Sequence, residues 1–200
     1  MISVIIPCKD RSENTKKILD ELMRQKKDVP AEIIVIENGS TEDMSFLNDF
    51  DITLRHEDIV GYGHAVNTGL SLCKGDYVCF IDNDDWISPD YLRTIYENIQ
   101  SGMDWYVWQW TSDEMPVLML DMDITDPLKK NWALWGYCFK RDLITKFKFD
   151  ETKMAGSDLL IFDIITKETK GAFIKKVLYH FKWANNNDSL SHIYNSQKHN

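Results

Sequence analysis

An apolar run ends abruptly in a cluster of acids in the stretch Tyr77-Val78-Cys79-Phe80-Ile81-Asp82-Asn83-Asp84-Asp85. The β-branched and aromatic residues at its start favour a buried strand, so the acids would lie at the carboxyl end of that strand. Three carboxylates within four residues repel one another unless a cation or hydrogen-bond donors lie among them. Oxygen ligands of this kind suit a hard divalent cation such as Mg²⁺ or Mn²⁺. The stretch therefore predicts a strand that delivers a metal site to the edge of a sheet.

Strands and helices alternate on both sides of this stretch. The expected strands lie at residues 2–6, 33–36, 52–54 and 77–81, and the expected helices at 12–25, for about ten residues after 61–63, and from 88 onward. Ser88 would cap the last of these helices, with Pro89 in its first turn. This alternation implies right-handed crossovers and a parallel sheet, in which ligands bind beyond the carboxyl ends of the strands. The polar strand ends at 8–10, 37–39 and 82–85 should therefore face one crevice.

The second half of the chain has a different character. Strands are expected near residues 104–110, 117–120, 136–139 and 177–183, and a helix over 157–166. Because the alternation is weaker here, we expect a smaller region of mixed or antiparallel strands packed onto the parallel half. The sequence thus predicts an α/β fold with a mostly parallel central sheet flanked by helices.

Composition narrows the class of protein. The chain has 200 residues, of which 44% are hydrophobic, enough for one large core. It carries 23 basic and 32 acidic residues, and a net charge of −9 argues against a nucleic-acid backbone binder. A nucleotide ligand remains compatible, because a bound metal can offset its charge.

The cysteines and the hydropathy pattern indicate a cytoplasmic protein. Cys8, Cys73, Cys79 and Cys138 are not in CxxC spacing, and we interpret them as reduced structural thiols. No signal peptide is recognisable, and no apolar run approaches the ~20 residues of a transmembrane helix. Nothing in the sequence indicates the oligomeric state.

Four ordered pieces of the chain carry a resemblance to a known family. They are Ile5-Ile6-Pro7 before a helix, the run from Ile36 to Asp43, Ala65-Val66-Asn67-Thr68-Gly69-Leu70, and Lys74-Gly75-Asp76-Tyr77 leading into Asp82-Asn83-Asp84-Asp85. The chain resembles family 2 of the glycosyltransferases, which have the GT-A fold. The match is close over about the first hundred residues. It is looser in the second half, at Trp135, Arg141, 149–151, 156–158 and 189–191.

The resemblance implies an activity and a division of the chain. Members of the family transfer a sugar, with inversion at the anomeric carbon, from a nucleoside diphosphate donor that is usually uridine-based. A single GT-A domain over 1–200 would have a nucleotide-sugar-binding half at 1–103 and an acceptor-binding half at 104–200. The implied partners are a UDP-sugar and a glycan or other hydroxyl acceptor.

The resemblance also assigns residues to roles. The expected nucleotide-sugar contacts are Pro7, Cys8, Lys9, Asp10, Glu37, Asn38, Gly63, His64, Asn67, Asp82 and Asn83. Asp82 and Asp84 match the family's DxD motif, and Asp84 is the better candidate for direct coordination of Mn²⁺ or Mg²⁺. His180 is a candidate third ligand, although a structural histidine is the default on an apolar strand. Asp158 takes the position of the catalytic base. Trp135 and Trp183 are expected at the acceptor site.

Several positions depart from the family pattern and keep other interpretations open. Asn38 replaces a common aspartate, Val66 a frequent arginine, and Ser157 the glutamate that usually precedes the base. These changes motivate an alternative, a nucleotide-sugar-binding protein without catalysis. A sugar nucleotidyltransferase is a third class, but it would carry a glycine-rich basic loop that residues 7–12 lack.

The acid cluster also has two simpler interpretations. It could be a solvated turn ahead of a helix cap. A calcium loop of the EF-hand type is disfavoured, because its sixth position would be Ile87 and its twelfth Arg93.

Overall fold

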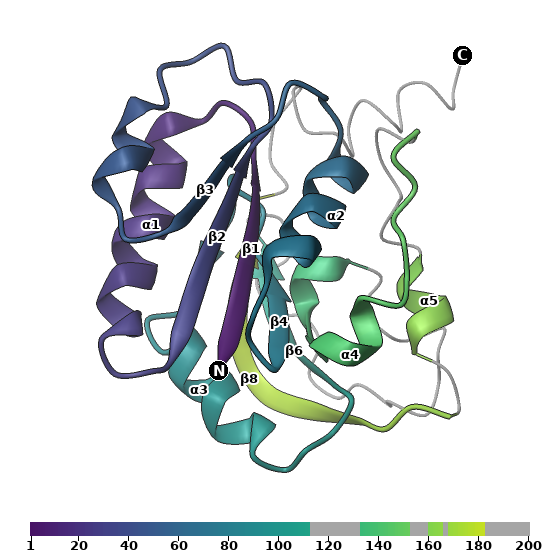
Figure 1. Ribbon diagram of the computed structural model, residues 1–200. Helices are drawn as coiled ribbons and strands as arrows, with labels where there is room; N and C mark the ends of the chain where they lie inside the picture. Colours follow the sequence, from purple (N-terminus) through teal and green to yellow (C-terminus); the bar gives the residue numbers. More distant parts are fainter. Residues whose placement is uncertain (113–132, 153–159, 166–167, 183–200) are drawn as a thin grey trace.

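The computed structural model describes residues 1–112, 133–152, 160–165 and 168–182. In these residues one eight-stranded sheet has the order β3-β2-β1-β4-β7-β6-β8-β5 (Figure 1). The strands are β1 Ile2–Cys8, β2 Ala31–Glu37, β3 Thr53–His56, β4 Tyr77–Phe80, β5 Trp86–Ile87, β6 Trp105–Ser112, β7 Tyr137–Lys140 and β8 Gly171–Phe181. The helices are α1 Ser12–Lys26, α2 Tyr62–Leu72, α3 Tyr91–Ile99, α4 Arg141–Ile144 and α5 Ile161–Ile164, with 3-10 turns η1 Ser45–Asp49 and η3 Leu134–Gly136.

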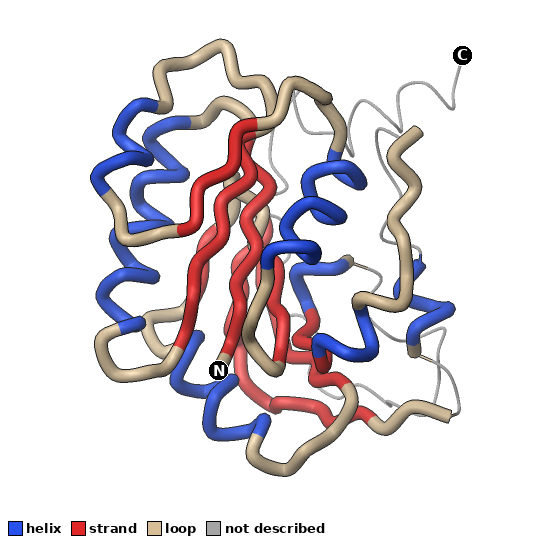
Figure 2. The backbone as a smooth tube through the Cα atoms, in the orientation of Figure 1, coloured by secondary structure: helices blue, strands red, loops and turns tan. Residues whose placement is uncertain are grey.

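The sheet is parallel in its first half and mixed in its second. β3, β2, β1 and β4 are parallel neighbours, which confirms the predicted α/β class. β7 pairs antiparallel with β4 and with β6, β8 runs parallel to β6, and β5 pairs antiparallel with β8. The later strands are mixed, as predicted, and they join the parallel half edge to edge, because β7 hydrogen-bonds to β4 and continues the same sheet (Figure 2).

Helices cover both faces of the sheet, which explains why β1 is apolar along almost its whole length. Ile2, Val4 and Ile6 contact the buried side chains of α1 and α3. Ile5 points to the opposite face and packs among residues of α2. Alternate residues of a strand face opposite sides, so a strand covered on both sides must be apolar at nearly every position.

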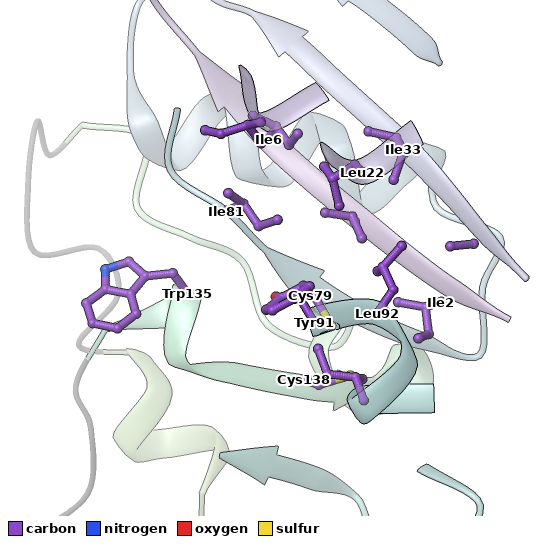
Figure 3. Close-up of a cluster of buried hydrophobic side chains, with 14 of the residues drawn as sticks. Ile2, Ile6, Leu22, Ile33, Cys79, Ile81, Tyr91, Leu92, Trp135 and Cys138 are labelled. Atoms are coloured by element: carbon purple, nitrogen blue, oxygen red, sulfur yellow. The ribbon is translucent and has the colours of Figure 1, made fainter. Parts of the chain in front are cut away.

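The core beneath α1 and α3 also contains sulfur and aromatic side chains (Figure 3). Cys79 of β4 lies opposite Cys138 of β7 in the strand ladder, and both are buried. All four cysteines of the chain are free and buried, as expected for structural thiols. Burial raises the pKa of the Cys138 thiol, which keeps it protonated.

Two predicted helices differ from the observed ones. The helix expected from Ser88 begins at Tyr91, because the Ser88 N–H bonds to the Leu178 carbonyl at 2.9 Å and extends residues 86–88 along β8. Of the helix expected over 157–166, the described part contains α5 at Ile161–Ile164. The strand expected at 117–120 lies outside the described residues. In the part of the chain that the structure describes, no helix is long and apolar enough to cross a membrane.

The substitution Gly69→Ala is expected to destabilise the fold by roughly 1–2 kcal/mol. A Cβ at this position would lie 2.4 Å from Cγ2 of the fully buried Ile5. Overpacking typically costs about 1–3 kcal/mol, and the better helix propensity of alanine returns up to ~1 kcal/mol. Urea unfolding of both proteins measures the difference. Ser71→Ala, on the exposed side of α2, is the control and should change stability by less than about 0.5 kcal/mol. Equal effects of the two changes would contradict the close packing of α2 on β1.

Candidate functional site

The carboxyl edge of the parallel strands brings together the three polar strand ends that the sequence predicted. The backbone N–H of Asn38, after β2, bonds to the carbonyl of Cys8, at the end of β1, at 2.8 Å. The Ile81 N–H, after β4, bonds to the Ile5 carbonyl at 3.1 Å. The parallel topology alone places these segments side by side, although they are far apart in the sequence.

Asp10 joins the loop after β1 to the loop after β2. Its carboxylate accepts hydrogen bonds from the backbone N–H groups of Thr41 and Glu42, at 2.6 and 3.1 Å, and from the Lys9 ammonium at 2.8 Å. Its own N–H donates to the Ser40 hydroxyl at 2.7 Å. The Lys9 ammonium and then the backbone donors hold the pKa of Asp10 well below its usual range. Asp10, which was expected to contact the nucleotide-sugar, is therefore an ionised residue that hydrogen-bonds the two loops together.

Asn38 and Glu37 hold the backbone around them. The Asn38 side chain is buried, and its Oδ1 accepts from the Gly61 N–H at 2.7 Å while its amide donates to the Ile59 carbonyl. Glu37 accepts from the Ser40 N–H at 2.6 Å. Burial opposes ionisation of Glu37, yet its hydrogen bonds outweigh burial and lower its pKa. Contact of this pair with a nucleotide base stays a prediction, beside a role in shaping the loops.

Asn83 and Cys8 lie beneath the surface of the edge. The Asn83 amide donates to the Asp10 carbonyl at 2.9 Å and to the Thr15 hydroxyl at 3.0 Å, and it contacts the Cys8 sulfur at 3.5 Å. Both side chains are more than nine-tenths buried. Burial raises the pKa of the Cys8 thiol to about 11. Asn83 and Cys8, which were predicted to contact the nucleotide-sugar, lie buried beneath the loop that contains Asp10 and support it in this structure.

The end of β8 fastens the acid cluster. Asp85 is fully buried, and its carboxylate accepts from the Tyr179 hydroxyl at 2.7 Å and from the Lys182 N–H at 2.8 Å. The same hydroxyl accepts from the backbone N–H of Asp82 at 3.0 Å. Burial, followed by the negative charges of Asp84 and Asp82, raises the pKa of Asp85 well above its usual range. Asp85 is thus a structural acid, and Asp82 and Asp84 remain as candidate ligands.

Asp84 forms an ion pair with Arg11. Its carboxylate accepts from the guanidinium of Arg11, and its carbonyl accepts from the Asn14 amide at 3.0 Å. An open pocket of about 230 Å³ adjoins the pair, and it is lined by Arg11, Ser12, Glu13, Asn14, Glu42, Asp84 and Lys182.

The donor set fits Mn²⁺ or Mg²⁺ with help from a ligand. Within the described ranges there is no group of three or more His, Cys, Asp or Glu side chains that could hold a metal ion. These ions, however, commonly use one or two carboxylates and complete their shell with water and phosphate oxygens. The Arg11 guanidinium shows that the Asp84 carboxylate accepts a cationic partner. Asp84 and Asp82 therefore suit a metal that arrives together with a phosphate-bearing ligand.

His180, the candidate third ligand, lies within the β5–β8 ladder opposite Trp86. Its Nδ1 is 2.8 Å from the Thr111 hydroxyl, and its ring packs edge-on against Trp86 with centroids 5.2 Å apart. These contacts are those of a structural histidine, and the ligand role stays a prediction.

Trp135, expected at the acceptor site, belongs to the aromatic core. Its ring stacks on Tyr179 with centroids 4.5 Å apart and on Phe181 at 5.4 Å, and it is 6% exposed. Little of the ring is available to a sugar in this packing. Trp183 and Asp158 lie outside the described residues.

The predicted contacts on α2 face the segment that follows α4. The Asn67 amide donates to the Phe149 carbonyl at 2.9 Å, and its Oδ1 accepts from the Phe149 N–H at 2.9 Å. A Cβ at Gly63 would lie 2.5 Å from the Asp150 carbonyl oxygen, so the glycine allows a close approach of the two backbones. Gly63 and Asn67 therefore couple the two halves of the chain.

The substitution His64→Gln is expected to make stability less dependent on pH. His64 lies 3.2 Å from Glu151 and 3.3 Å from Glu57, which are themselves paired with Lys148 and Arg55. Burial alone would lower the pKa of His64, but the two carboxylates outweigh it and raise the pKa above 6.5. The added stability is therefore fully present below about pH 6.5 and is lost as the pH rises through the raised pKa.

Urea unfolding at about pH 5.5 and about pH 8.5 measures this effect. The wild type should exceed His64→Gln by on the order of 0.5–1 kcal/mol more at the lower pH. The control His56→Gln removes a side chain that is 62% exposed and should show a smaller difference. A His64→Gln deficit that is the same at both pH values would contradict the role of the charged histidine.

Sequence reasoning missed two residues of the site, Arg11 and Tyr179. Arg11 directly follows the first polar strand end at 8–10, and a basic residue there is a signal for a counter-ion of the acids after β4. Tyr179 offered no signal, because an aromatic residue on an apolar strand is usually core. Its hydroxyl reaches the acids only through the β5–β8 pairing.

Comparison with known proteins identifies the family. Residues 3–148 match the sequence profile of "Glycosyl transferase family 2". Glycosyltransferase GlyA of Streptococcus pneumoniae is 26% identical over 214 residues, which cover 90% of this chain and 30% of GlyA. Among solved structures, S. aureus TarS 1–349 in complex with UDP-GlcNAc superposes with a TM-score of 0.81 at 18% identity, over 95% of this chain and 60% of TarS 1–349. Glucosyl-3-phosphoglycerate synthase of Mycobacterium tuberculosis, in complex with Mn²⁺, UDP and glucosyl-3-phosphoglycerate, has a TM-score of 0.69 at 17% identity, over 97% and 75% of the two chains.

These likenesses differ in what they establish. The structural neighbours share the fold at low identity, which confirms the predicted GT-A architecture. The chain spans less than a third of GlyA and about three fifths of TarS 1–349. Because the family profile covers more than half of the sequence, the chain belongs to glycosyl transferase family 2, as its ordered motifs predicted.

Proposed function

We propose that this chain transfers a sugar from a UDP-sugar to an acceptor hydroxyl, with inversion at the anomeric carbon and with the help of Mn²⁺ or Mg²⁺. The observation that carries the proposal is the position of Asp82 and Asp84 at the carboxyl end of β4, beside the loops after β1 and β2. A crevice at this edge is where open α/β sheets bind ligands. The UDP-GlcNAc in the TarS complex and the Mn²⁺ and UDP in the mycobacterial synthase complex support the choice of donor and metal.

Each residue of the edge has a task in this reaction. Asp84 and Asp82 would hold the metal, which when bound would supply positive charge to the departing diphosphate. The loops after β1 and β2, held together by Asp10, contact the base and ribose. Asp158 takes the proton of the acceptor hydroxyl as the oxygen of that hydroxyl bonds to the anomeric carbon. The bond from that carbon to the diphosphate oxygen breaks on the opposite side, which inverts the configuration.

A second candidate is a protein that binds a nucleotide-sugar without transferring it. The Asn38 amide, at a position where the family commonly has aspartate, bonds to the backbone of residues 59 and 61. Base recognition could then differ from that of the family. Binding of a nucleotide-sugar with no transfer to a broad panel of acceptors would favour this function.

A thermal-shift screen of nucleoside diphosphates and nucleotide-sugars tests the proposed function. UDP or a UDP-sugar with Mn²⁺, at about 100 times its Kd, should stabilise the protein by ~2.7 kcal/mol, or about 5–10 °C in Tm. The shift should fall when EDTA removes the metal. GDP and ADP with Mn²⁺ are the matched controls. The absence of a shift with every nucleotide, with or without Mn²⁺, would contradict the proposal, and pyrophosphate release from UTP and a sugar phosphate would indicate a nucleotidyltransferase instead.

A further inference from the structure

Arg11 has a fixed position at the start of α1. Its backbone is left-handed, with φ 61°, a conformation that is uncommon for residues other than glycine. Its carbonyl accepts hydrogen bonds from the N–H and the hydroxyl of Thr15, both at 3.0 Å. The first turn of the helix thus holds the residue whose guanidinium pairs with Asp84.

The ion pair is largely shielded from water. The Arg11 side chain is 23% exposed and that of Asp84 is 18% exposed. Partial burial strengthens the attraction between the two charges compared with a pair on the open surface. Asp82 and Asp85 are close in sequence to Asp84, so the guanidinium also offsets repulsion among the acids.

The other basic groups near this edge have different partners. Lys9 pairs with Asp10 at 2.8 Å, and the Lys182 ammonium lies 5.6 Å from the centre of the Trp86 ring. Among the described residues, Arg11 is therefore the cation placed on the carboxylate that the proposed function assigns to the metal.

We propose that Arg11 competes with the divalent metal for Asp84. This inference rests on the proposed function, in which Asp84 is the principal metal ligand. The guanidinium occupies Asp84 until a metal and its nucleotide displace it, and the adjoining pocket of about 230 Å³ provides space for the released side chain. Glu13 and Glu42 line that pocket and offer negative charge to the released Arg11 side chain. The guanidinium and the metal exclude each other at Asp84, so each weakens the binding of the other by the same factor. The ion pair therefore lowers the affinity of Asp84 for the metal when no nucleotide is bound.

The test compares Mn²⁺ affinity in wild type and Arg11→Gln, measured by the decrease of the free Mn²⁺ signal in electron paramagnetic resonance without nucleotide. If the carboxylate is open in about a tenth of the wild-type molecules, Arg11→Gln should bind Mn²⁺ about tenfold more tightly. Lys16→Gln is the matched control. It removes the same charge from α1, but Lys16 pairs with Asp20 on the exposed surface, at 3.0 Å, so its affinity should change less than about twofold.

Thermal unfolding without metal gives an independent measurement. Arg11→Gln should melt below the wild type without Mn²⁺ and should gain more from saturating Mn²⁺. Arg11→Lys retains a charge at this site, so it should have an affinity between those of wild type and Arg11→Gln, and it serves if Arg11→Gln does not fold.

Two results would overturn the competition. Equal Mn²⁺ affinity in wild type, Arg11→Gln and Arg11→Lys would show that Arg11 does not occupy the metal position, and the proposed function would stand. Weaker binding in Arg11→Gln would show that Arg11 organises the site for the metal. If none of the variants binds Mn²⁺, even with UDP, the metal-dependent function itself fails, and the competition fails with it.

Discussion

The substitution Asp84→Asn is expected to lower the rate of sugar transfer by about 10²–10³-fold. Asparagine keeps the size of the side chain but loses the negative charge that a hard divalent cation requires. Without the metal, the charge that develops on the departing diphosphate loses the divalent counter-ion that the proposed function assigns to it. Release of UDP from the donor identified by the thermal-shift screen, at saturating acceptor, measures the rate. Mn²⁺ binding by electron paramagnetic resonance should be lost in the same variant.

A second aspartate, Asp142, is the control that separates the loss of the metal ligand from the loss of any negative charge. Asp142 lies on α4 with its side chain 90% exposed, and Asp142→Asn should leave both transfer and Mn²⁺ binding unchanged. Asp84→Asn also breaks the pair with Arg11, so a modest decrease in Tm is expected. Far-ultraviolet circular dichroism checks that the variant is folded. Wild-type turnover in a folded Asp84→Asn protein would remove Asp84 as the metal ligand.

The substitution Asp158→Asn is expected to lower transfer by about 10²–10⁴-fold without weakening the donor. Asparagine cannot accept the proton of the attacking hydroxyl, whereas the proposed contacts with the nucleotide-sugar and the metal lie on the loops after β1, β2 and β4. The thermal shift with UDP and Mn²⁺ should therefore equal that of the wild type.

Asp163 provides the control for this second prediction. It is an exposed aspartate on α5, close in sequence to Asp158, and Asp163→Asn should retain the wild-type rate and the wild-type thermal shift with UDP and Mn²⁺. A fully active Asp158→Asn enzyme would show that another group removes the proton. Loss of the UDP shift together with activity would place Asp158 at the donor rather than at the acceptor.

The parallel half of the fold could be predicted because local patterns decide it. The apolar runs at 2–6, 33–36 and 77–81 became β1, β2 and β4, with polar residues at the carboxyl ends where the topology requires them. The second half was less predictable. β5 is a two-residue strand because it pairs with β8 across about ninety residues of sequence, and no local pattern encodes such a pairing. β8 begins at Gly171, before the strand expected near 177–183, and its first residues pair with β6.

The sequence by itself determined the fold class, the family and the edge of the sheet at which Asp82 and Asp84 lie, since hydrophobic periodicity and short ordered motifs are local properties of a chain. Tertiary structure alone decided which polar groups are available there. It buried Asp85 against Tyr179, engaged Asn38 and Asn67 with neighbouring backbone, and placed Arg11 on Asp84. The physical reason is that a charge or a hydrogen-bonding group is satisfied by whatever lies near it in space. The partners here come from 21 to 94 residues away in the sequence, as the pairs Asn38–Ile59 and Asp85–Tyr179 illustrate.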